Sequence, residues 1–340
     1  MLPLSSPSSR VGGLVISSKS SRASTTSSRK KSLVEDPYYR IVNLASNHIY
    51  VRSTLQELPE EIDKLVKQMG QDCGSLGPSL DQIKDDAKLY DLQTGSGKQD
   101  VKQYFYSRIF YDPKSDKSDL LQRSARRLMS KKVVPQVDST HEISTPVPDL
   151  LYGYDHDRAF TEKHNAYLFN HGFERIVNTV GLSFPFFAIK FKGDGPGSRE
   201  SMWVATNQCI GASTSCVNIA KCFSDQLSQC KSDSIQPINS AAFSIAMNGS
   251  ETRLYVSWKH DKKVYYMQQF ETFSLQTPDH FSKFHKYVQN ILDWGRDKRL
   301  KDIQQPLNDP LLVSPPPPLD ESTSRNSRNR RASSPVGDES

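Results

Sequence analysis

One aspartate and two lysines are the residues whose types and spacing could do chemistry together. Asp149 follows a proline, and Lys190 and Lys192 end the most apolar segment of the chain. Side chains alternate along a strand, so the two lysines project from one face. A carboxylate offers hard oxygen ligands to a divalent cation, which activates bound water, while a lysine orients the nucleophile. This set predicts metal-assisted hydrolysis, provided that a second carboxylate joins Asp149.

The elements that must position these residues alternate between strand and helix after Pro146. Residues 184–192 are apolar on both faces until the last three positions, as expected for a strand in the middle of a sheet. Period-two or period-3.6 patterns predict strands at 150–154, 241–246, 253–258 and 263–270, and helices at 161–179, 198–227 and 278–300. The pattern predicts an α/β (α+β) fold with a mixed central sheet flanked by helices.

The region before Pro146 reads as mainly helical. Pro59, Glu60 and Glu61 favour a helix start, and Gly70 favours its end. We expect loops over 71–98, a core-facing helix over 99–112 and a basic helix over 120–129. Gly95-Ser96-Gly97-Lys98 does not complete a phosphate loop, because position 92 is Leu and Gln99 follows the lysine.

Several segments together resemble a known family. They are Asp36-Pro37-x-Tyr39-Arg40 with Asn43, Leu44 and Asn47, then Pro148-Asp149-Leu150-Leu151-Tyr152-Gly153-Tyr154, Phe184-Pro185-Phe186, Trp203-Val204-Ala205-Thr206-Asn207-Gln208 and Cys216-Val217-Asn218. Over about 35–300, the chain resembles fungal proteins of unknown function that carry a PD-(D/E)XK, restriction-endonuclease-like domain. The resemblance implies such a fold and places Asp149, Lys192 and Gln208 at the catalytic centre.

The chain departs from that pattern at two positions. Lys190 stands where the family has its acidic residue, and Thr206 stands where it has a glutamate. A lysine at a metal-ligand position should abolish two-carboxylate metal binding. Asp149 would bind Mg²⁺ or Mn²⁺ only with a relocated carboxylate, for which Asp194, Glu200 and Glu174 are the nearby candidates. Asp149 as a turn residue and the lysines as a solvated strand end remain open alternatives.

Five cysteines and no secretory signal argue against a disulfide framework. Cys209, Cys216, Cys222 and Cys230 are too widely spaced for a usual zinc site, which favours thiols on a helix. No apolar run approaches the ~20 residues of a membrane span. The first 32 residues hold six Lys or Arg and no acid, so much of the net charge of +6 lies in the tails.

These observations divide the chain into four parts. We expect a disordered basic, Ser-rich tail at 1–32, a helical region at 33–145 packing on the core, the nuclease-like domain at 146–312, and a disordered Pro/Ser/Arg-rich tail at 313–340. The tails suggest an intracellular protein, with nuclear import favoured over the cytoplasm and a mitochondrial transit peptide left open.

Three functions stay open. The chain is a catalytically impaired pseudo-nuclease that binds nucleic acid or a protein, an active metal-dependent nuclease with a relocated carboxylate, or an interaction protein with no nucleic-acid role. We favour the first, because Lys190 replaces a metal ligand.

Overall fold

A seven-stranded mixed sheet forms the centre of the molecule. The computed structural model describes residues 32–72, 77–116, 118–170, 173, 176–195, 201–229 and 238–309. The strands are β1 (Ile49–Arg52), β2 (Leu121–Ala125), β3 (Leu150–Asp155), β4 (Leu182–Phe191), β5 (Ala242–Met247), β6 (Glu251–Lys259) and β7 (Tyr265–Ser274). Their order is β1-β7-β6-β5-β4-β3-β2, with β1/β7 and β4/β5 parallel and the other pairs antiparallel. The predicted mixed α/β class is confirmed.

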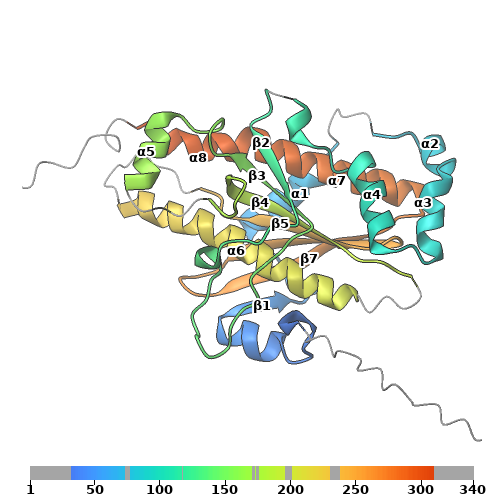
Figure 1. The fold of residues 1–340 in the computed structure, drawn as a ribbon, viewed down its shortest axis with the longest axis horizontal. Coiled ribbons are helices and arrows are strands. Elements are labelled where there is room, and N and C mark those ends of the chain that lie inside the picture. The colour runs from blue at the N-terminus through green and yellow to red at the C-terminus, as the bar shows by residue number, and fades with distance from the viewer. Residues whose placement is uncertain are drawn as a thin grey trace, which may run out of the picture. The chain divides into compact units, whose positions relative to one another are not determined.

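Helices cover both faces of this sheet (Figure 1). The long α6 (Met202–Gln229) packs along β4, β5 and β6 on one face, and α7 (Pro278–Trp294) with α8 (Leu300–Leu307) covers the other. Pro278 suits the first turn of α7, and Phe281, Phe284, Val288 and Ile291 recur on its buried face. A π-helical turn, η6 (Gly295–Arg299), joins α7 to α8 within the predicted 278–300 helix. Among the helices described, none combines the length and apolar character needed to cross a membrane.

The N-terminal region supplies helices and both edge strands. The helices are α1 (Glu60–Met69), α2 (Leu80–Lys84), α3 (Ala87–Asp91) and α4 (Lys98–Arg108), with shorter turns η1 (Leu33–Glu35), η2 (Arg40–Leu44), η3 (Leu92–Thr94), η4 (Pro113–Ser115) and η5 (Lys131–Val133). As predicted, α1 ends at Gly70. The predicted loop at 71–98 is wrong over α2 and α3; Ser79 and Gln82 form a capping box at the start of α2.

The predicted basic helix at 120–129 is also wrong, because β2 occupies its first half. Gln122 and Ser124 are buried on this strand, where Gln122 donates to the carbonyl of Val180 and Asn178 donates to the hydroxyl of Ser124. Tertiary hydrogen bonds therefore satisfy polar side chains at buried positions, and the strand lacks an apolar alternation. The predicted helix at 161–179 is shorter: α5 spans Glu162–Asn170.

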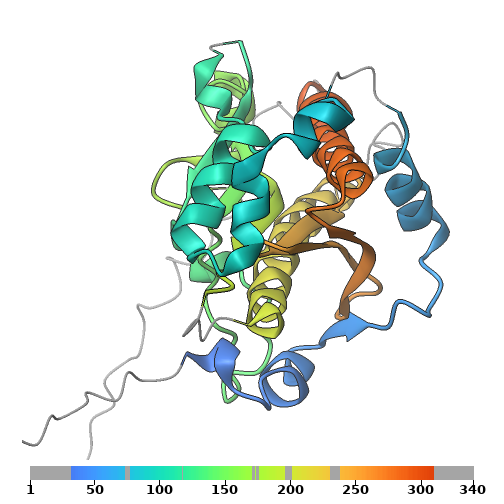
Figure 2. The same cartoon turned by 90° about the vertical axis from the view of Figure 1, so that its right-hand side faces the viewer.

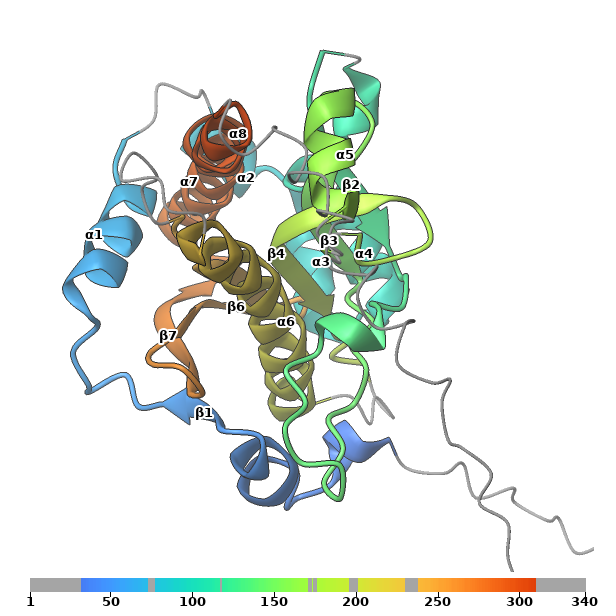
Figure 3. The ribbon, with the colours of Figure 1, turned by 90° about the vertical axis from the view of Figure 1, so that its left-hand side faces the viewer.

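Two views locate the ends of the sheet. In Figure 2 the viewer faces the end where α4 and the beginning of α6 lie. In Figure 3 the viewer faces the other side, where α5 lies near α8 and β1 lies beside β7. Residues 1–31 and 310–340, on which the predicted import and transit signals fall, lie outside the described residues, as do Cys73 and Cys230.

Candidate functional site

Asp149 lies directly before β3, beside the end of β4. Leu150 pairs with Ile189, which brings Asp149 next to Lys190 across the two strands. The backbone N–H of Asp149 donates to the carbonyl of Ile189 at 3.0 Å, and its own carbonyl accepts from the hydroxyl of Tyr106 at 2.9 Å. These bonds fix the backbone, and Asp149 is only 2% exposed.

Two ammonium groups and one backbone N–H surround the carboxylate of Asp149. Its Oδ2 accepts a hydrogen bond from the N–H of Phe191 at 3.0 Å. The same oxygen lies 3.1 Å from Nζ of Lys98 and 3.3 Å from Nζ of Lys190. Lys190 also donates to the carbonyl of Val147 at 3.0 Å. Lys190 and Lys98 thus neutralise the carboxylate of Asp149.

The pKa shifts follow from this burial and charge. Burial opposes the ionised form of Asp149, but the charges of Lys190 and Lys98 outweigh it and hold the pKa of the carboxyl below its usual value. Burial lowers the pKa of Lys190, and the attraction of Asp149 only partly offsets that effect. Asp149 is therefore firmly ionised, and Lys190 loses its proton more easily than a surface lysine.

Lys98 reaches the site because two glycine-containing loops pack against each other. The loop before α4, residues 95–97, contacts residues 193–195 after β4, where the N–H of Asp194 donates to the carbonyl of Ser96. A Cβ on Gly193 would lie 2.6 Å from the backbone nitrogen of Lys98. Only glycine permits this approach. The segment that does not complete a phosphate loop therefore delivers a cation to Asp149.

Further positive groups adjoin this pair. The N–H of Arg126 donates to the carbonyl of Asp149 at 3.3 Å. Burial lowers the pKa of Lys102 most, and repulsion by Arg126 lowers it further. Asp149 is the one negative group among the main charges that act on Lys102, and it raises this pKa. Burial raises the pKa of Cys209 to about 12, and the charges of Lys190, Lys192 and Asp149 all act on this thiol. We call this group the Asp149 cluster: Lys98, Lys102, Arg126, Asp149, Lys190 and Lys192.

The side chains of the Asp149 cluster do not form a binding site for a divalent cation. Asp149 offers one carboxylate, and ammonium groups already occupy the space beside its Oδ2. Both carboxylate oxygens of Asp194 accept hydrogen bonds from neutral donors, Asn248 at 2.5 Å and Ser250 at 2.8 Å. The other two candidates for a relocated ligand, Glu174 and Glu200, lie outside the described residues. A hard cation needs several oxygen ligands, and this donor set is mostly cationic.

The remaining predicted site residues lie on β4 and α6. Lys192 is buried, and its backbone N–H continues the pairing with β5 through the carbonyl of Met247. Gln208 is half-buried, and its Oε1 accepts no hydrogen bond within the described residues. The hydroxyls of Thr206 and Tyr255 lie 3.0 Å apart and form a neutral hydrogen bond. The helix predicted at 161–179 does not flank the site, because α5 lies at the opposite end of the strands (Figure 1).

Several of the motif residues described in the sequence analysis hold the segment around Val34 and Arg40 against α6. Nε of Arg40 donates to Oδ1 of Asn207 at 2.6 Å, and the guanidinium lies 5.2 Å from the ring centroid of Trp203. Nδ2 of Asn207 also donates to the carbonyl of Val34. The Asp-Pro segment and the α6 segment thus meet in space, and these motif residues have structural roles.

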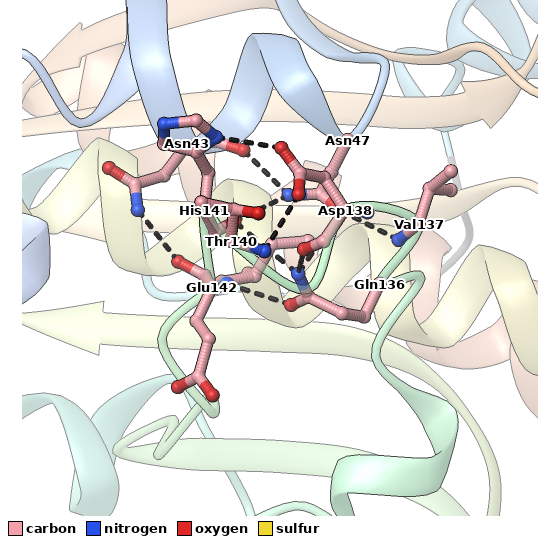
Figure 4. Close-up of polar contacts among 9 residues, drawn as sticks. Asn43, Asn47, Gln136, Val137, Asp138, Thr140, His141 and Glu142 are labelled. Carbon is pink, nitrogen blue, oxygen red and sulfur yellow. Dashed lines mark hydrogen bonds and ion pairs between the residues drawn. The ribbon is translucent and has the colours of Figure 1, made fainter.

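The buried Asn47 has a similar role (Figure 4). Its Oδ1 accepts from the backbone N–H groups of Val137 at 2.6 Å and Asp138 at 2.8 Å, and its Nδ2 donates to the carbonyl of His141. Asn43 donates to the carbonyl of Glu142. These bonds fix the loop that leads towards Asp149.

Among the described residues, other clusters of ligating side chains offer no stronger site. Asp155, His156 and Asp157 approach one another, but Asp155 is engaged by Arg158 and by turn N–H groups. Cys209, Cys216 and Cys222 are free thiols on α6, and burial raises the pKa of each.

Lys98 and Lys102 are the candidate functional residues that sequence reasoning missed. The signal was present in the glycine-flanked lysine at the start of a helix, but only the fold brings it to Asp149.

One comparison covers most of the fold. A search among curated proteins gave no match. A family model described as "Domain of unknown function (DUF7924)" matches residues 96–307, which run from the loop before Lys98 to the end of α8. The match includes the whole Asp149 cluster, and the chain therefore belongs to the DUF7924 family.

Proposed function

We propose that this protein is a nuclease-like protein of the PD-(D/E)XK type that has lost metal-dependent hydrolysis and binds nucleic acid through the Asp149 cluster. One observation carries the proposal: the remaining carboxylate lies 3.1 Å and 3.3 Å from two ammonium groups. The placement of Asp149 before β3 and of Lys190 and Lys192 at the end of β4 supports the likeness to this nuclease type.

The charge balance favours a phosphate ligand. The cluster contains five cations and one carboxylate, so after Asp149 is neutralised it keeps a positive surplus. Lys98 and Lys102 are partly exposed on α4, so a phosphodiester can reach them from solvent. Neutralising phosphates releases counterions, which makes such binding strongly dependent on salt.

Binding and cleavage should be measured on the full chain. Labelled single-stranded and duplex DNA and RNA are titrated with the protein and followed by fluorescence anisotropy, with EDTA and with Mg²⁺ or Mn²⁺. The salt concentration is varied from about 50 to about 200 mM, a range over which binding through phosphate contacts weakens strongly. We expect binding that EDTA does not weaken and no cleavage. Lys98→Ala/Lys102→Ala should weaken binding about tenfold or more and reduce the salt slope by ~1 per lost phosphate contact.

The matched control is Lys298→Ala/Lys301→Ala, which removes two exposed lysines from η6 and α8. Equal binding by wild type and the Lys98/Lys102 variant would remove the proposal. Metal-dependent cleavage that Asp149→Ala abolishes would instead establish the active nuclease. Absence of any nucleic-acid binding would favour the third function, an interaction protein with no nucleic-acid role.

A further inference from the structure

Aromatic and basic side chains gather at the hairpin between β6 and β7. Strand β6 ends at Lys259, β7 begins at Tyr265, and β1 lies beside β7 with Tyr50 paired to Tyr266. We call the group the hairpin patch: Tyr50, Arg52, Trp258, Lys259, His260, Lys262, Lys263 and Tyr266. Figure 3 shows β1 and β7 side by side at this end of the sheet.

The rings of the hairpin patch form a continuous set. The ring centroid of Tyr266 lies 6.1 Å from that of Tyr50, 5.8 Å from that of Trp258 and 5.4 Å from that of His260. The guanidinium of Arg52 lies over Trp258 and Tyr266, at 5.4 Å and 5.2 Å from their centroids. Tyr50 is 38% exposed and His260 is exposed, so their rings are open to a ligand.

The cations of the patch lack acidic partners within the described residues. Lys64, Lys67 and Lys298 each pair with a carboxylate one helical turn away, but Arg52, Lys259, Lys262 and Lys263 form no ion pair in the described ranges. The acid in this turn, Asp261, accepts hydrogen bonds from the N–H groups of Lys263 and Val264. Its carboxylate is thus used to shape the turn.

We infer that the hairpin patch binds single-stranded nucleic acid. Unpaired bases can stack on the exposed rings and on the Arg52 guanidinium, while the lysines contact the backbone phosphates. Base-on-aromatic stacking beside a cationic surface is how proteins hold single strands, because every base has a π-face that a duplex hides. Unpaired bases use the open rings and their phosphates use the lysines, so the pairing of charge with open rings favours the nucleic acid.

The hairpin patch and the Asp149 cluster lie at opposite ends of the sheet. Lys192 hydrogen-bonds Met247, Met247 pairs with Thr252, and β6 then runs to Lys259. From Thr252 to Lys259 the strand extends roughly 23 Å at about 3.3 Å per residue. The inference rests on the proposed nucleic-acid binding, but its residues are separate and can be tested independently.

The test uses the full chain and two variants of the patch. Lys262→Glu/Lys263→Glu changes charge at the exposed turn, and Tyr50→Ala/His260→Ala removes two open rings. The control, Lys298→Glu/Lys301→Glu, makes the same charge change on η6 and α8. The probes share one sequence of ~20 nucleotides, longer than the roughly 4–16 nucleotides that a small single-strand-binding fold covers. They are single-stranded DNA, single-stranded RNA and duplex DNA, and binding is followed by fluorescence anisotropy. Circular dichroism and thermal unfolding verify the fold of each variant.

We expect the charge variant to lose about tenfold or more in affinity for both single strands, with a salt slope reduced by ~0.7 per lost contact. The ring variant should lose affinity for single strands by about tenfold and for the duplex by much less. A stronger loss on RNA than on DNA would identify a ribose contact and still support the inference.

The outcomes separate the two sites. If the patch variants bind like wild type while the Lys98/Lys102 variant does not, the hairpin inference fails and the proposed function stands. If only the patch variants lose binding, the proposed role of the Asp149 cluster fails. Equal losses on single strand and duplex in the ring variant overturn the stacking, and no binding by wild type overturns both.

Discussion

Asp149→Asn is the substitution that tests the Asp149 cluster most directly. Asparagine keeps the shape of the side chain and an oxygen that can accept from the N–H of Phe191, but it removes the negative charge. Lys190 is then left with 10% of its side chain exposed and without its carboxylate partner. We expect the variant to fold with clearly lower stability.

The magnitude follows from the two charge pairs. At 3.1 Å and 3.3 Å and an effective dielectric constant of ~20, each pair contributes roughly 5 kcal/mol of gross attraction. Desolvation offsets much of this, and removal of one partner of a buried pair typically costs about 3–5 kcal/mol. Lys98 is 30% exposed and can regain water, so the expected loss is ~3 kcal/mol.

Urea unfolding followed by tryptophan fluorescence provides the free energies, with the m-value as a check on the transition. The double variant Asp149→Asn/Lys190→Met removes the stranded charge and should recover about 2 kcal/mol of the loss. A single variant as stable as wild type, or a double variant no more stable than Asp149→Asn, would refute the assigned charge pairing.

Four further predictions concern the same cluster. Asp149→Asn should bind nucleic acid several-fold more tightly in anisotropy, because the cluster gains net positive charge; weaker binding would instead indicate a metal ligand. Binding should weaken as pH rises through the lowered pKa of Lys190, below the ordinary 10.5, because only the protonated lysine attracts phosphate, whereas Lys190→Arg should show no such step. Folding favours the neutral form of Lys190, so this residue's contribution to stability should increase with pH between its folded pKa and 10.5, measured by urea unfolding. Gly193→Ala should cost about 1–3 kcal/mol in urea unfolding and weaken binding, since its Cβ would lie 2.6 Å from the backbone of Lys98; an unchanged midpoint would contradict the close packing of the two loops.

The central strands and the main helices could be predicted because their apolar residues follow their burial. Strand β4 is buried at every position, and α7 buries a regular apolar stripe, so pattern and structure agree. Strand β2 could not be predicted, because hydrogen bonds from distant loops satisfy its buried Gln122 and Ser124.

Only the site residues on or next to β3 and β4 could be predicted from the sequence. Alternation places Lys190 and Lys192 together, and the register of β3 with β4 brings Asp149 beside Lys190. Lys98 could not be predicted, because its position depends on the approach of the 95–97 and 193–195 loops, and sequence spacing does not encode such long-range packing.

The placement of β1 has a practical consequence for fragments of this chain. The family match begins at residue 96, but β1, Ile49–Arg52, lies before it and pairs with residues 265–268 of β7. A fragment cut at the family boundary would leave β7, a ten-residue strand, as the open edge of the sheet. Long open edges recruit strands from other molecules, so such a fragment should aggregate or exchange strands more readily than one beginning near residue 32, in which β1 still pairs with residues 265–268 of β7.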